Sequence, residues 1–554
     1  MMQGVPTAAN FDAVVVGAGF SGMLALYRLR AIGLSVLVVE TGHGVGGTWY
    51  WNRYPGARCD VESLDYSYQF SEQLQQEWEW SERYASQPEI LRYLNHVADR
   101  FDLRRHIRLA TRVDAANYDE DRALWIVQTD SGSQIFAKWL LMASGCLSRP
   151  NKPPFPGEDH FKGRIYHTGQ WPDAAVDFVG QRVGVIGTGS SGVQAIPIIA
   201  EQAAHLTVFQ RTASYCAPAH NGLLDPTIQQ RVKANYRAFR ERSNAEKGGA
   251  QFNSSRAQAL NVESAERDRI YEARWAVGGL HFQAAFSDLF VNAEANETAA
   301  EFVRGKIHSI VKNPATAAAL IPIHLIGCKR LCVDTGYYAT FNRDNVTLVD
   351  VRHAPIEEIT PTGLRTCHAS YDLDIIVFAT GYDAMTGALD AIDISGRDGV
   401  VLKEAWRAGP RTYLGISTAG FPNLFVIAGP GSPSVLTNMV ASIEQHVDWI
   451  ARCIARQQQS DVVVFEASEQ AQDKWVDTVN AIANHTVFPG CNSWYLGANV
   501  PGKTRVFMPY AGGLPAYRQK CEDVAAAGYE GFIARKSSAV ASPTYSKGAS
   551  PEKC

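Results

Sequence analysis

FDAVVVGAGFSGMLALYRLRAIGLSVLVVE, at residues 11–40, is the stretch of sequence that decides the fold. It contains a short apolar run, a glycine-rich turn, a helical pattern and a second apolar run ending in Glu40. This order predicts a βαβ unit. Gly17 permits a tight turn, Gly19 lets the backbone approach a pyrophosphate, and Gly22 lets the helix pack on the strand. Because the helix start also offers free N–H groups to phosphates, the unit predicts a dinucleotide site.

The same pattern recurs at residues 181–212, QRVGVIGTGSSGVQAIPIIAEQAAHLTVFQRT. Gly187, Gly189 and Gly192 take the three glycine roles in this copy. Two dinucleotide units in one chain predict an enzyme that brings two nucleotide cofactors together.

The two units differ where their second strand ends. The first has Glu40, whose carboxylate can bind both hydroxyls of a ribose, whereas the second has Arg211 followed by Thr212. A carboxylate repels a 2′-phosphate, and a guanidinium binds one through two hydrogen bonds. The first site therefore suits FAD or NAD and the second suits NADPH, which together indicate a flavoenzyme reduced by NADPH.

The expected fold class is α/β, with two Rossmann-like dinucleotide-binding domains and a helical insertion. Composition shifts towards helix formers and charged residues after the second unit, and the C-terminal tail is rich in Ser, Pro and Lys. The predicted division is an FAD-binding domain at 11–147 plus 383–535, an NADP-binding domain at 148–215 plus 327–382, a helical insertion at 216–326 and a disordered tail at 536–554.

Composition excludes several other classes of protein. The chain has 554 residues, of which 46% are hydrophobic, and 52 basic residues against 56 acidic ones give a net charge of −4, so no basic surplus points to nucleic acid. Ten cysteines form no CxxC pair, which disfavours a metal site or a secreted disulfide framework and favours a reducing cytoplasm. The N-terminus lacks a signal-peptide pattern, and the longest charge-free run, 412–443, is broken by Gly and Pro, so no membrane span is expected. Since no coiled-coil heptad is present, we expect a monomer.

A motif just ahead of the second glycine turn gives the family. FKGRIYHTGQWP at 161–172 resembles the fingerprint FxGxxxHxxxWP of the Baeyer–Villiger monooxygenases, flavin enzymes that convert ketones to esters or lactones. Flavin monooxygenases that oxygenate sulfur or nitrogen typically end this pattern in Phe or Tyr. The fingerprint residues are Phe161, Gly163, His167, Trp171 and Pro172.

Further motifs extend the resemblance over about residues 11–535 and are most similar to the phenylacetone and steroid monooxygenase branch. They are GGTWYWNRYPGARCDVES at 46–63, GCKRLCVDTGYY at 327–338, FATGYDAMTG at 378–387, GPGSPSVLTNM at 429–439 and NSWYLGANVPGK at 492–503.

The resemblance implies a reaction cycle and two catalytic residues. NADPH reduces FAD, O2 adds to give a C4a-peroxyflavin, and its attack on the ketone forms a negatively charged Criegee adduct that rearranges. Such an adduct needs a fixed cation, and Arg suits this task because it stays protonated and offers a rigid fork of donors. The resemblance assigns that role to Arg330 and pairs it with Asp60.

The family's cofactor contacts carry over to matching positions. Those for FAD are Gly17, Gly19, Ser21, Gly22, Glu40, Thr48, Trp49, Tyr50, Trp51, Asp60, Tyr66 and, through its backbone, Val113. Those for NADPH are Arg58, Cys59 and Asp60 near the nicotinamide, Gly187, Thr188, Gly189, Ser190, Ser191, Gly192 and Gln194 at the phosphates, Arg211 and Thr212 at the 2′-phosphate, and Lys329, Arg330 and Trp494. His167 is expected to help couple the two nucleotide domains.

Substrate choice is the least determined feature. By resemblance, Ser434, Val435 and Leu436 border an apolar ketone pocket, which does not distinguish aryl, cyclic, steroidal and long-chain ketones. The alternatives are a flavin monooxygenase acting on sulfur or nitrogen, an NADPH-dependent disulfide reductase, for which Cys328 and Cys332 are the only pair close in sequence, and a redox sensor without catalysis.

Overall fold

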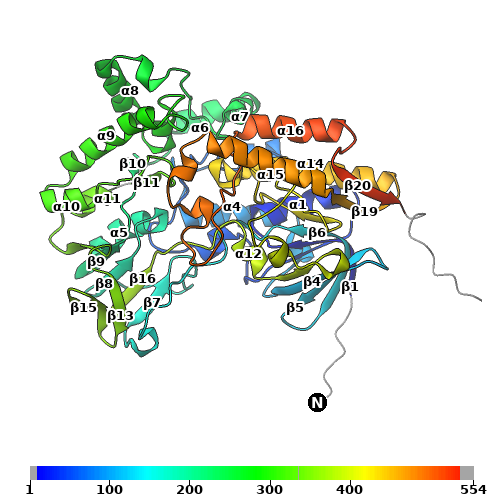
Figure 1. Cartoon of the computed structure of the whole chain (residues 1–554), viewed down its shortest axis with the longest axis horizontal. Coiled ribbons are helices and arrows are strands. Elements are labelled where there is room, and N and C mark those ends of the chain that lie inside the picture. The colour runs from blue at the N-terminus through cyan, green and yellow to red at the C-terminus, as the bar shows by residue number, and fades with distance from the viewer. Residues whose placement is uncertain (1–8, 335, 537–554) are drawn as a thin grey trace, which may run out of the picture.

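Two separate β-sheets carry the two glycine-rich turns. The computed structural model describes residues 9–334 and 336–536. In Figure 1 the sheet with β1, β4, β5 and β6 lies on the right and the sheet with β7, β8, β9 and β16 lies on the left, with helices along the top. The α/β fold class with two nucleotide-binding units is confirmed, while the exact domain boundaries stay a prediction.

The first sheet has eight strands and places the first glycine turn at its centre. Seven strands run in the order β17-β4-β5-β6-β1-β2-β3, and β18 pairs with β6. β1, β2, β3, β6 and β18 are parallel, whereas β4 and β5 form an antiparallel connection to β6. The strands are β1 (Ala9–Val16), β2 (Val36–Val39), β3 (Ile107–Arg108), β4 (Val113–Asp119), β5 (Leu124–Thr129), β6 (Gln134–Met142), β17 (Asp393–Ser395) and β18 (Leu424–Val426).

The second sheet has five strands, all parallel, in the order β12-β9-β8-β16-β7. Its apolar strands are buried on both faces, as expected for a parallel sheet covered by helices. The strands are β7 (Arg164–His167), β8 (Arg182–Ile186), β9 (His205–Gln210), β12 (Val346–Asp350) and β16 (Ile375–Phe378). Three shorter strands, β13 (Ile356–Thr360), β14 (Gly363–Thr366) and β15 (Ser370–Asp372), form an antiparallel sheet of their own.

Helices cover the sheets and supply the phosphate-facing termini. α1 (Phe20–Ala31) follows the first glycine turn and packs on α14 (Met439–Gln459), while α5 (Ser190–Gln202) follows the second turn. In Figure 1, α15 (Glu469–Asn484) and α16 (Leu514–Ala526) lie with α14 above the first sheet. The remaining longer helix near the first unit is α4 (Gln87–Arg100).

The predicted helical insertion, 216–326, is mostly helical and lies at the upper left of Figure 1. Its helices are α6 (Pro226–Lys233), α7 (Tyr236–Ala245), α8 (Ser264–Val277), α9 (Ala293–Ile310) and α10 (Pro314–Ala319). Its first residues are an exception, because β10 (Cys216–Pro218) pairs with β11 (Cys332–Asp334) beyond the insertion.

The C-terminal strand corrects one predicted boundary. β20 (Phe532–Lys536) pairs with β19 (Val462–Ala467), so Lys536 belongs to a strand and not to a disordered tail. Backbone pairing with β19 overrides the polar local composition there. The rest of the predicted tail, 537–554, lies outside the described residues. Within the described ranges, no helix is long and apolar enough to cross a membrane, and no group of His, Cys, Asp or Glu side chains has a metal-binding arrangement.

Two glycines show why the first turn tolerates no larger residue. Gly17 has φ +105°, and a Cβ there would lie 2.6 Å from the Ala143 carbonyl oxygen. A Cβ on Gly22 would lie 1.7 Å from the Gly17 carbonyl oxygen. α1 can therefore approach the turn only because this helix position has no side chain.

We expect Gly22→Ala to destabilise the protein by about 3 kcal/mol and to abolish FAD retention, because α1 must move away from the turn. The measurements are urea unfolding and the flavin-to-protein absorbance ratio. Gly305→Ala is the matched control, since Gly305 is exposed in α9 and a Cβ there has no atom within 4 Å. Equal flavin content in the two variants would contradict the packing argument.

Glu444 of α14 makes stability depend on pH. Its buried carboxylate accepts backbone N–H bonds from Gln69 (2.7 Å) and Phe70 (3.0 Å). Burial raises the pKa of Glu444 from 4.5 to about 7, against the lowering effect of these bonds. Since the folded pKa lies above the unfolded one, the folded protein holds the extra proton between these values, and stability falls as pH rises from 4.5 through 7.

In urea unfolding, the free energy of unfolding should thus fall by an amount on the order of 3 kcal/mol between about pH 4.5 and pH 7.5. Glu444→Gln should remove this fall. The exposed Glu241→Gln on α7 is the control and should keep the slope. An unchanged slope in Glu444→Gln would show that other groups cause it.

Candidate active site

Glu40 stands beside the first glycine turn, where the sequence predicts the ribose. One carboxylate oxygen accepts a hydrogen bond from the Ala18 backbone N–H and the other from that of Gly42, each at 2.7 Å. Burial raises the pKa of Glu40, and the two backbone bonds partly oppose this rise. Each oxygen keeps a second acceptor position, so the carboxylate can hold two ribose hydroxyls without losing its anchor.

An aromatic segment closes over the same turn. α2 (Thr48–Trp51) begins after Gly47. A Cβ on Gly19 would lie 3.3 Å from the Gly47 Cα, so the two backbones approach closely beside the predicted pyrophosphate site. Trp49 Nε1 donates to the Tyr66 hydroxyl at 3.2 Å, and their rings meet edge to face. The other predicted FAD residues here are Ser21, buried in the first turn of α1, Tyr50 and Trp51 in α2, and Val113, buried at the start of β4.

The second glycine turn is held by its own hydroxyl groups. Gly187 has φ +108°, and a Cβ on Gly192 would lie 2.3 Å from the Gly187 carbonyl oxygen, which repeats the first turn. The Thr188 hydroxyl donates to the Thr212 carbonyl at 2.9 Å, and Ser191 accepts a bond from Thr168 at 3.2 Å. Ser190 lies at the start of α5, with its hydroxyl 3.7 Å from Cys332 Sγ. The first N–H groups of α5 have no partner within the helix and are available to the predicted phosphates.

The second unit has two cations that are predicted to bind NADPH, Arg211 directly after β9 and Lys329. Arg211 is exposed, and Lys329 is half-buried. Burial, and to a smaller extent the charge of Arg211, lower the pKa of Lys329. Neither has an ion-pair partner among the described residues. A 2′-phosphate dianion would neutralise such unpaired positive charges.

Asp60 and Arg330 form a bidentate ion pair. Arg330 Nε donates to one Asp60 oxygen at 2.6 Å and Nη2 donates to the other at 2.8 Å, although 270 residues separate the two in sequence. A third bond runs from Nη1 to the Val435 carbonyl at 2.7 Å. Burial alone would lower the pKa of Arg330, but the charge and hydrogen bonds of Asp60 raise it overall. The guanidinium is therefore a fixed cation at any relevant pH.

Val435 belongs to the predicted ketone pocket, so Arg330 and that predicted pocket contact each other directly. Ser434–Leu436 form a short 3-10 turn, and the Ser434 hydroxyl donates to the Ala428 carbonyl at 3.1 Å. Apolar side chains gather around this turn, among them Met385, Phe507 and Met508, with Leu436 and Trp494 at the edge.

Tyr495 is a residue of the site that sequence reasoning missed. Its buried ring packs 4.3 Å from the Trp494 ring. Burial raises the pKa of Tyr495 to about 12, although the charge of Arg330 acts in the opposite direction. The signal was its place beside Trp494 in the motif at 492–503.

The segment that carries Asp60 also reaches the second unit. Gln194 of α5 accepts a bond from the Tyr54 hydroxyl at 2.8 Å and donates to the Arg58 carbonyl at 3.1 Å. Arg58 is held by Glu82 at 2.6 Å. Burial raises the pKa of Cys59, so this thiol stays protonated beside Asp60. The segment of the predicted nicotinamide residues is therefore bonded to the helix that follows the second glycine turn.

Most residues of the fingerprint at 161–172 pack in the apolar core of the second unit or against its backbone. Trp171 is buried in the core of the second unit, with its ring centroid 5.3 Å from that of Tyr166, and Pro172 follows it. Phe161 packs in a neighbouring apolar cluster. A Cβ on Gly163 would lie 2.4 Å from the Asp374 carbonyl oxygen. These residues do not reach Arg330 directly.

His167 provides the fingerprint's link towards the first unit. Its Nδ1 accepts the Gly169 N–H at 2.9 Å, and burial lowers the pKa of the ring, which keeps it neutral. The ring faces Tyr382 at 6.4 Å, and the Tyr382 hydroxyl donates to Asn52 at 2.9 Å.

Cys328 takes part in a disulfide, whereas the cysteine spacing predicted free thiols. It forms a disulfide with Cys491 rather than pairing with the nearby Cys332, which instead lies opposite Cys216 in the β10–β11 register. A partner 163 residues away cannot be deduced from spacing.

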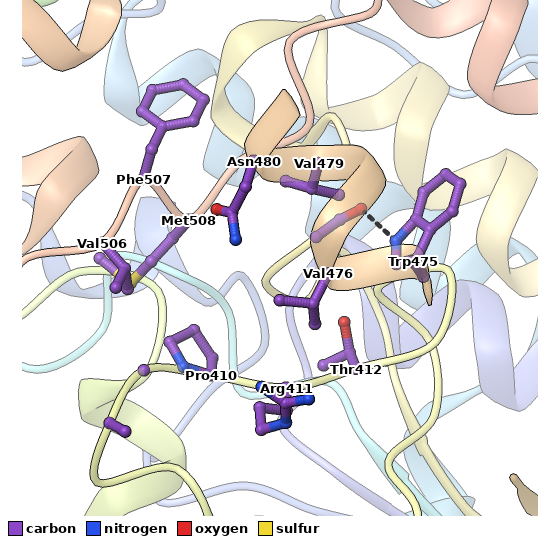
Figure 2. Close-up of a pocket in the computed structure, with 13 residues that line it drawn as sticks. Pro410, Arg411, Thr412, Trp475, Val476, Val479, Asn480, Val506, Phe507 and Met508 are labelled. Atoms are coloured by element: carbon purple, nitrogen blue, oxygen red, sulfur yellow. Dashed lines mark hydrogen bonds between the residues drawn. The ribbon is translucent and has the colours of Figure 1, made fainter. Parts of the chain in front are cut away.

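A cavity of about 140 Å³ lies beside, and not within, the predicted site. Figure 2 shows its walls, with the Trp475 indole bonded to the Gly431 carbonyl at 3.0 Å and the Asn480 side chain directed into the space. Met508 is shared with the apolar cluster around Val435. The cavity contains neither Arg330 nor Asp60.

Comparisons with known proteins decide the family. The family model described as pyridine nucleotide-disulphide oxidoreductase matches residues 14–297. A Baeyer-Villiger monooxygenase of Pseudooceanicola batsensis is 45% identical over 95% of this chain and 96% of its own length. The solved structure of oxidized steroid monooxygenase bound to NADP is 52% identical, with a TM-score of 0.91, covering 95% of this chain and 99% of that one.

The chain belongs to the Baeyer–Villiger monooxygenases. A structure of OTEMO in complex with FAD and NADP, 41% identical with a TM-score of 0.92, covers 96% of this chain and all of that one. The protein is thus an FAD-containing, NADPH-dependent enzyme that converts ketones to esters or lactones. Its own residues fit both cofactors, because the Gly17–Gly22 turn admits a pyrophosphate and Arg211 with Lys329 lacks a counter-charge.

We expect Arg211→Ala to raise KM for NADPH by about 10- to 100-fold while changing KM for NADH less than about threefold, because only NADPH carries the 2′-phosphate. Steady-state kinetics with both cofactors check this. Arg352→Ala, which removes an arginine paired with Asp350 next to β12, is the matched control. An equal loss with both cofactors would place Arg211 outside the 2′-phosphate site.

Proposed function

We propose that Arg330 is the fixed cation of the ketone-oxidising reaction, that Asp60 positions it, and that the substrate is an uncharged ketone with hydrocarbon on both sides of its carbonyl. The observation that carries the proposal is the three-bond fixation of Arg330 by Asp60 and Val435. Bound FAD, reduced by NADPH, supplies the activation of O2.

Hydrogen-bond counting supports the role of Arg330. A guanidinium has five N–H donors, and Asp60 and Val435 occupy three of them, which leaves 5 − 3 = 2 on the two Nη atoms. These two donors remain for the oxyanion that develops from the ketone. Because the group is already oriented and charged, it needs no rearrangement when negative charge appears on the substrate oxygen.

The apolar cluster supports the substrate class. Val435, Leu436, Phe507 and Met508 offer hydrocarbon, and the Arg330 fork is the polar group beside them. Such a pocket favours a neutral substrate whose single oxygen reaches the guanidinium. Asp60 and Arg330 are the polar groups at this pocket. The apolar side chains around them exclude water from the reacting atoms.

The setting of the enzyme is part of the same proposal. We expect a monomer in the cytoplasm that takes a ketone and O2 as its substrates. Seven cysteines in the described part of the chain are free, which supports a reducing compartment. The Cys328–Cys491 bond is the one feature among the described residues that departs from this pattern.

We expect Arg330→Ala to reduce ester formation by about 1,000-fold or more while NADPH oxidation continues and releases hydrogen peroxide, because oxyanion stabilisation is lost. Arg330→Lys should remain roughly 10-fold or more slower than the wild type, because lysine restores the positive charge but not the planar set of N–H donors. Coupled assays of NADPH, peroxide and ester measure this.

Arg365→Ala in the β13–β14–β15 sheet, which removes an exposed arginine paired with Glu357 and Glu358, is the control and should stay fully active. Ester formation by Arg330→Ala at the wild-type rate would reject the proposal. A wild-type enzyme that oxygenates sulfides or amines but none of a panel of ketones would instead favour the heteroatom monooxygenase alternative.

A further inference from the structure

The Cys328–Cys491 disulfide joins two segments that carry predicted active-site residues. The Cα atoms are 6.2 Å apart, a distance usual for a disulfide. Cys328 directly precedes Lys329 and Arg330, and Cys491 lies three residues before Trp494. The bond therefore ties the segment of the catalytic arginine to the segment that packs beside it.

The position of Cys328 is fixed by the helical segment before it. Asn296 of α9, fully buried, donates to the Ile326 carbonyl and accepts from the Ile326 N–H, both at 2.9 Å. Gly327 adopts φ +83°, and a Cβ there would lie 2.3 Å from the Phe290 ring. This tight, anchored turn leaves the Cys328 sulfur little freedom.

The segment of Cys491 meets the same helical region without covalent help. The Val487 N–H donates to the Phe290 carbonyl at 2.8 Å, and the Phe290 and Phe488 rings stack at 5.6 Å. These contacts lie within four residues of Cys491. They keep the two sulfur atoms near each other when the bond is open, so closing it costs little chain entropy.

The two cysteines differ in access. Cys328 is fully buried, whereas Cys491 is partly exposed. An oxidant from solution therefore meets Cys491 first, and Cys328 is placed to resolve the product. This division of roles is that of a reactive and a resolving thiol.

We propose that Cys328 and Cys491 form a reversible oxidative modification site that holds the 491–495 segment against the Arg330 segment. The oxidant is hydrogen peroxide: the Cys491 thiolate attacks it, an S–O bond forms, the O–O bond breaks, and water leaves after protonation. The Cys328 thiolate then attacks the Cys491 sulfur, an S–S bond forms, the S–O bond breaks, and a second water leaves. Two thiols lose two electrons, and one peroxide gains them. A dithiol reductant reverses the reaction by exchange.

The functional consequence rests on the proposed function of Arg330 and its neighbours. Trp494 and Tyr495 follow Cys491 and lie in the apolar cluster of Val435, whose carbonyl binds Arg330, so the closed bond limits the movement of this segment. Reduction releases the segment. Hydrogen peroxide is also the product expected above when activated O2 oxidises no ketone, so unproductive turnover would supply the oxidant.

The chemical part of the proposal is tested by thiol mapping on the full-length holoenzyme. One sample is treated with a dithiol and a second with hydrogen peroxide; both are desalted, denatured, alkylated and digested. The chain has ten cysteines, so the reduced sample should give ten alkylated sites and the oxidised sample 10 − 2 = 8, with one linked peptide pair containing Cys328 and Cys491. Cys491→Ser should lose the pair, and Cys367→Ser, which removes an exposed free thiol, should keep it.

Alkylation of both cysteines after peroxide treatment would overturn the proposal. A bond that resists the dithiol in the folded protein would overturn its reversibility. These outcomes do not depend on any assay of catalysis, so they separate failure of this proposal from failure of the proposed function.

The functional part is tested by the fraction of NADPH consumption that appears as hydrogen peroxide at saturating ketone. We expect this fraction to rise about threefold or more on reduction of the bond, and Cys491→Ser to show the high value under both conditions. Equal fractions in the oxidised, reduced and variant enzymes would reject a role in catalysis. Absence of ester from every form would reject the proposed function, while the thiol map would still decide the modification site.

Discussion

The ion pair between Asp60 and Arg330 is the interaction on which the active site depends. Asp60 lies in the segment after the first glycine turn, and Arg330 follows the helical insertion of the second unit. The pair therefore forms only when both nucleotide units are folded and in contact. Burying either charge alone would be strongly unfavourable, and bidentate pairing offsets that penalty. The third bond, to the Val435 carbonyl, extends the same fixed arrangement to the wall of the ketone pocket.

The cations of the site divide into two kinds. Arg330 is held in one place by three hydrogen bonds to protein groups and keeps N–H donors for a developing oxyanion. Arg211 and Lys329 have no ion-pair partner among the described residues, and burial with mutual repulsion lowers the pKa of Lys329. Unneutralised charges suit a cofactor that binds and leaves, because the phosphate removes the repulsion when it arrives.

Local patterns allowed much of this to be predicted from the sequence. The glycine turns and the contrast between Glu40 and Arg211 are readable because a βαβ unit fixes the spacing of turn, helix and strand end. Tyr495 and the Cys328–Cys491 bond were missed, since contacts between distant segments leave no local pattern. The pairing of β10 with β11 and the strand position of Lys536 depend likewise on distant backbone partners. The role of Arg330 came from family resemblance, and local composition alone would have suggested a surface arginine.

A double-mutant cycle on Asp60 and Arg330 tests most directly whether Arg330 acts through its pairing with Asp60. The rate of ester formation is measured for Asp60→Ala, Arg330→Ala, the double variant and the wild type, each loaded with FAD. If Asp60 works by holding the guanidinium, the double variant should be about as slow as Arg330→Ala alone, a coupling well above about 1.4 kcal/mol. Losses that simply multiply would show that the two residues act independently and would contradict the account.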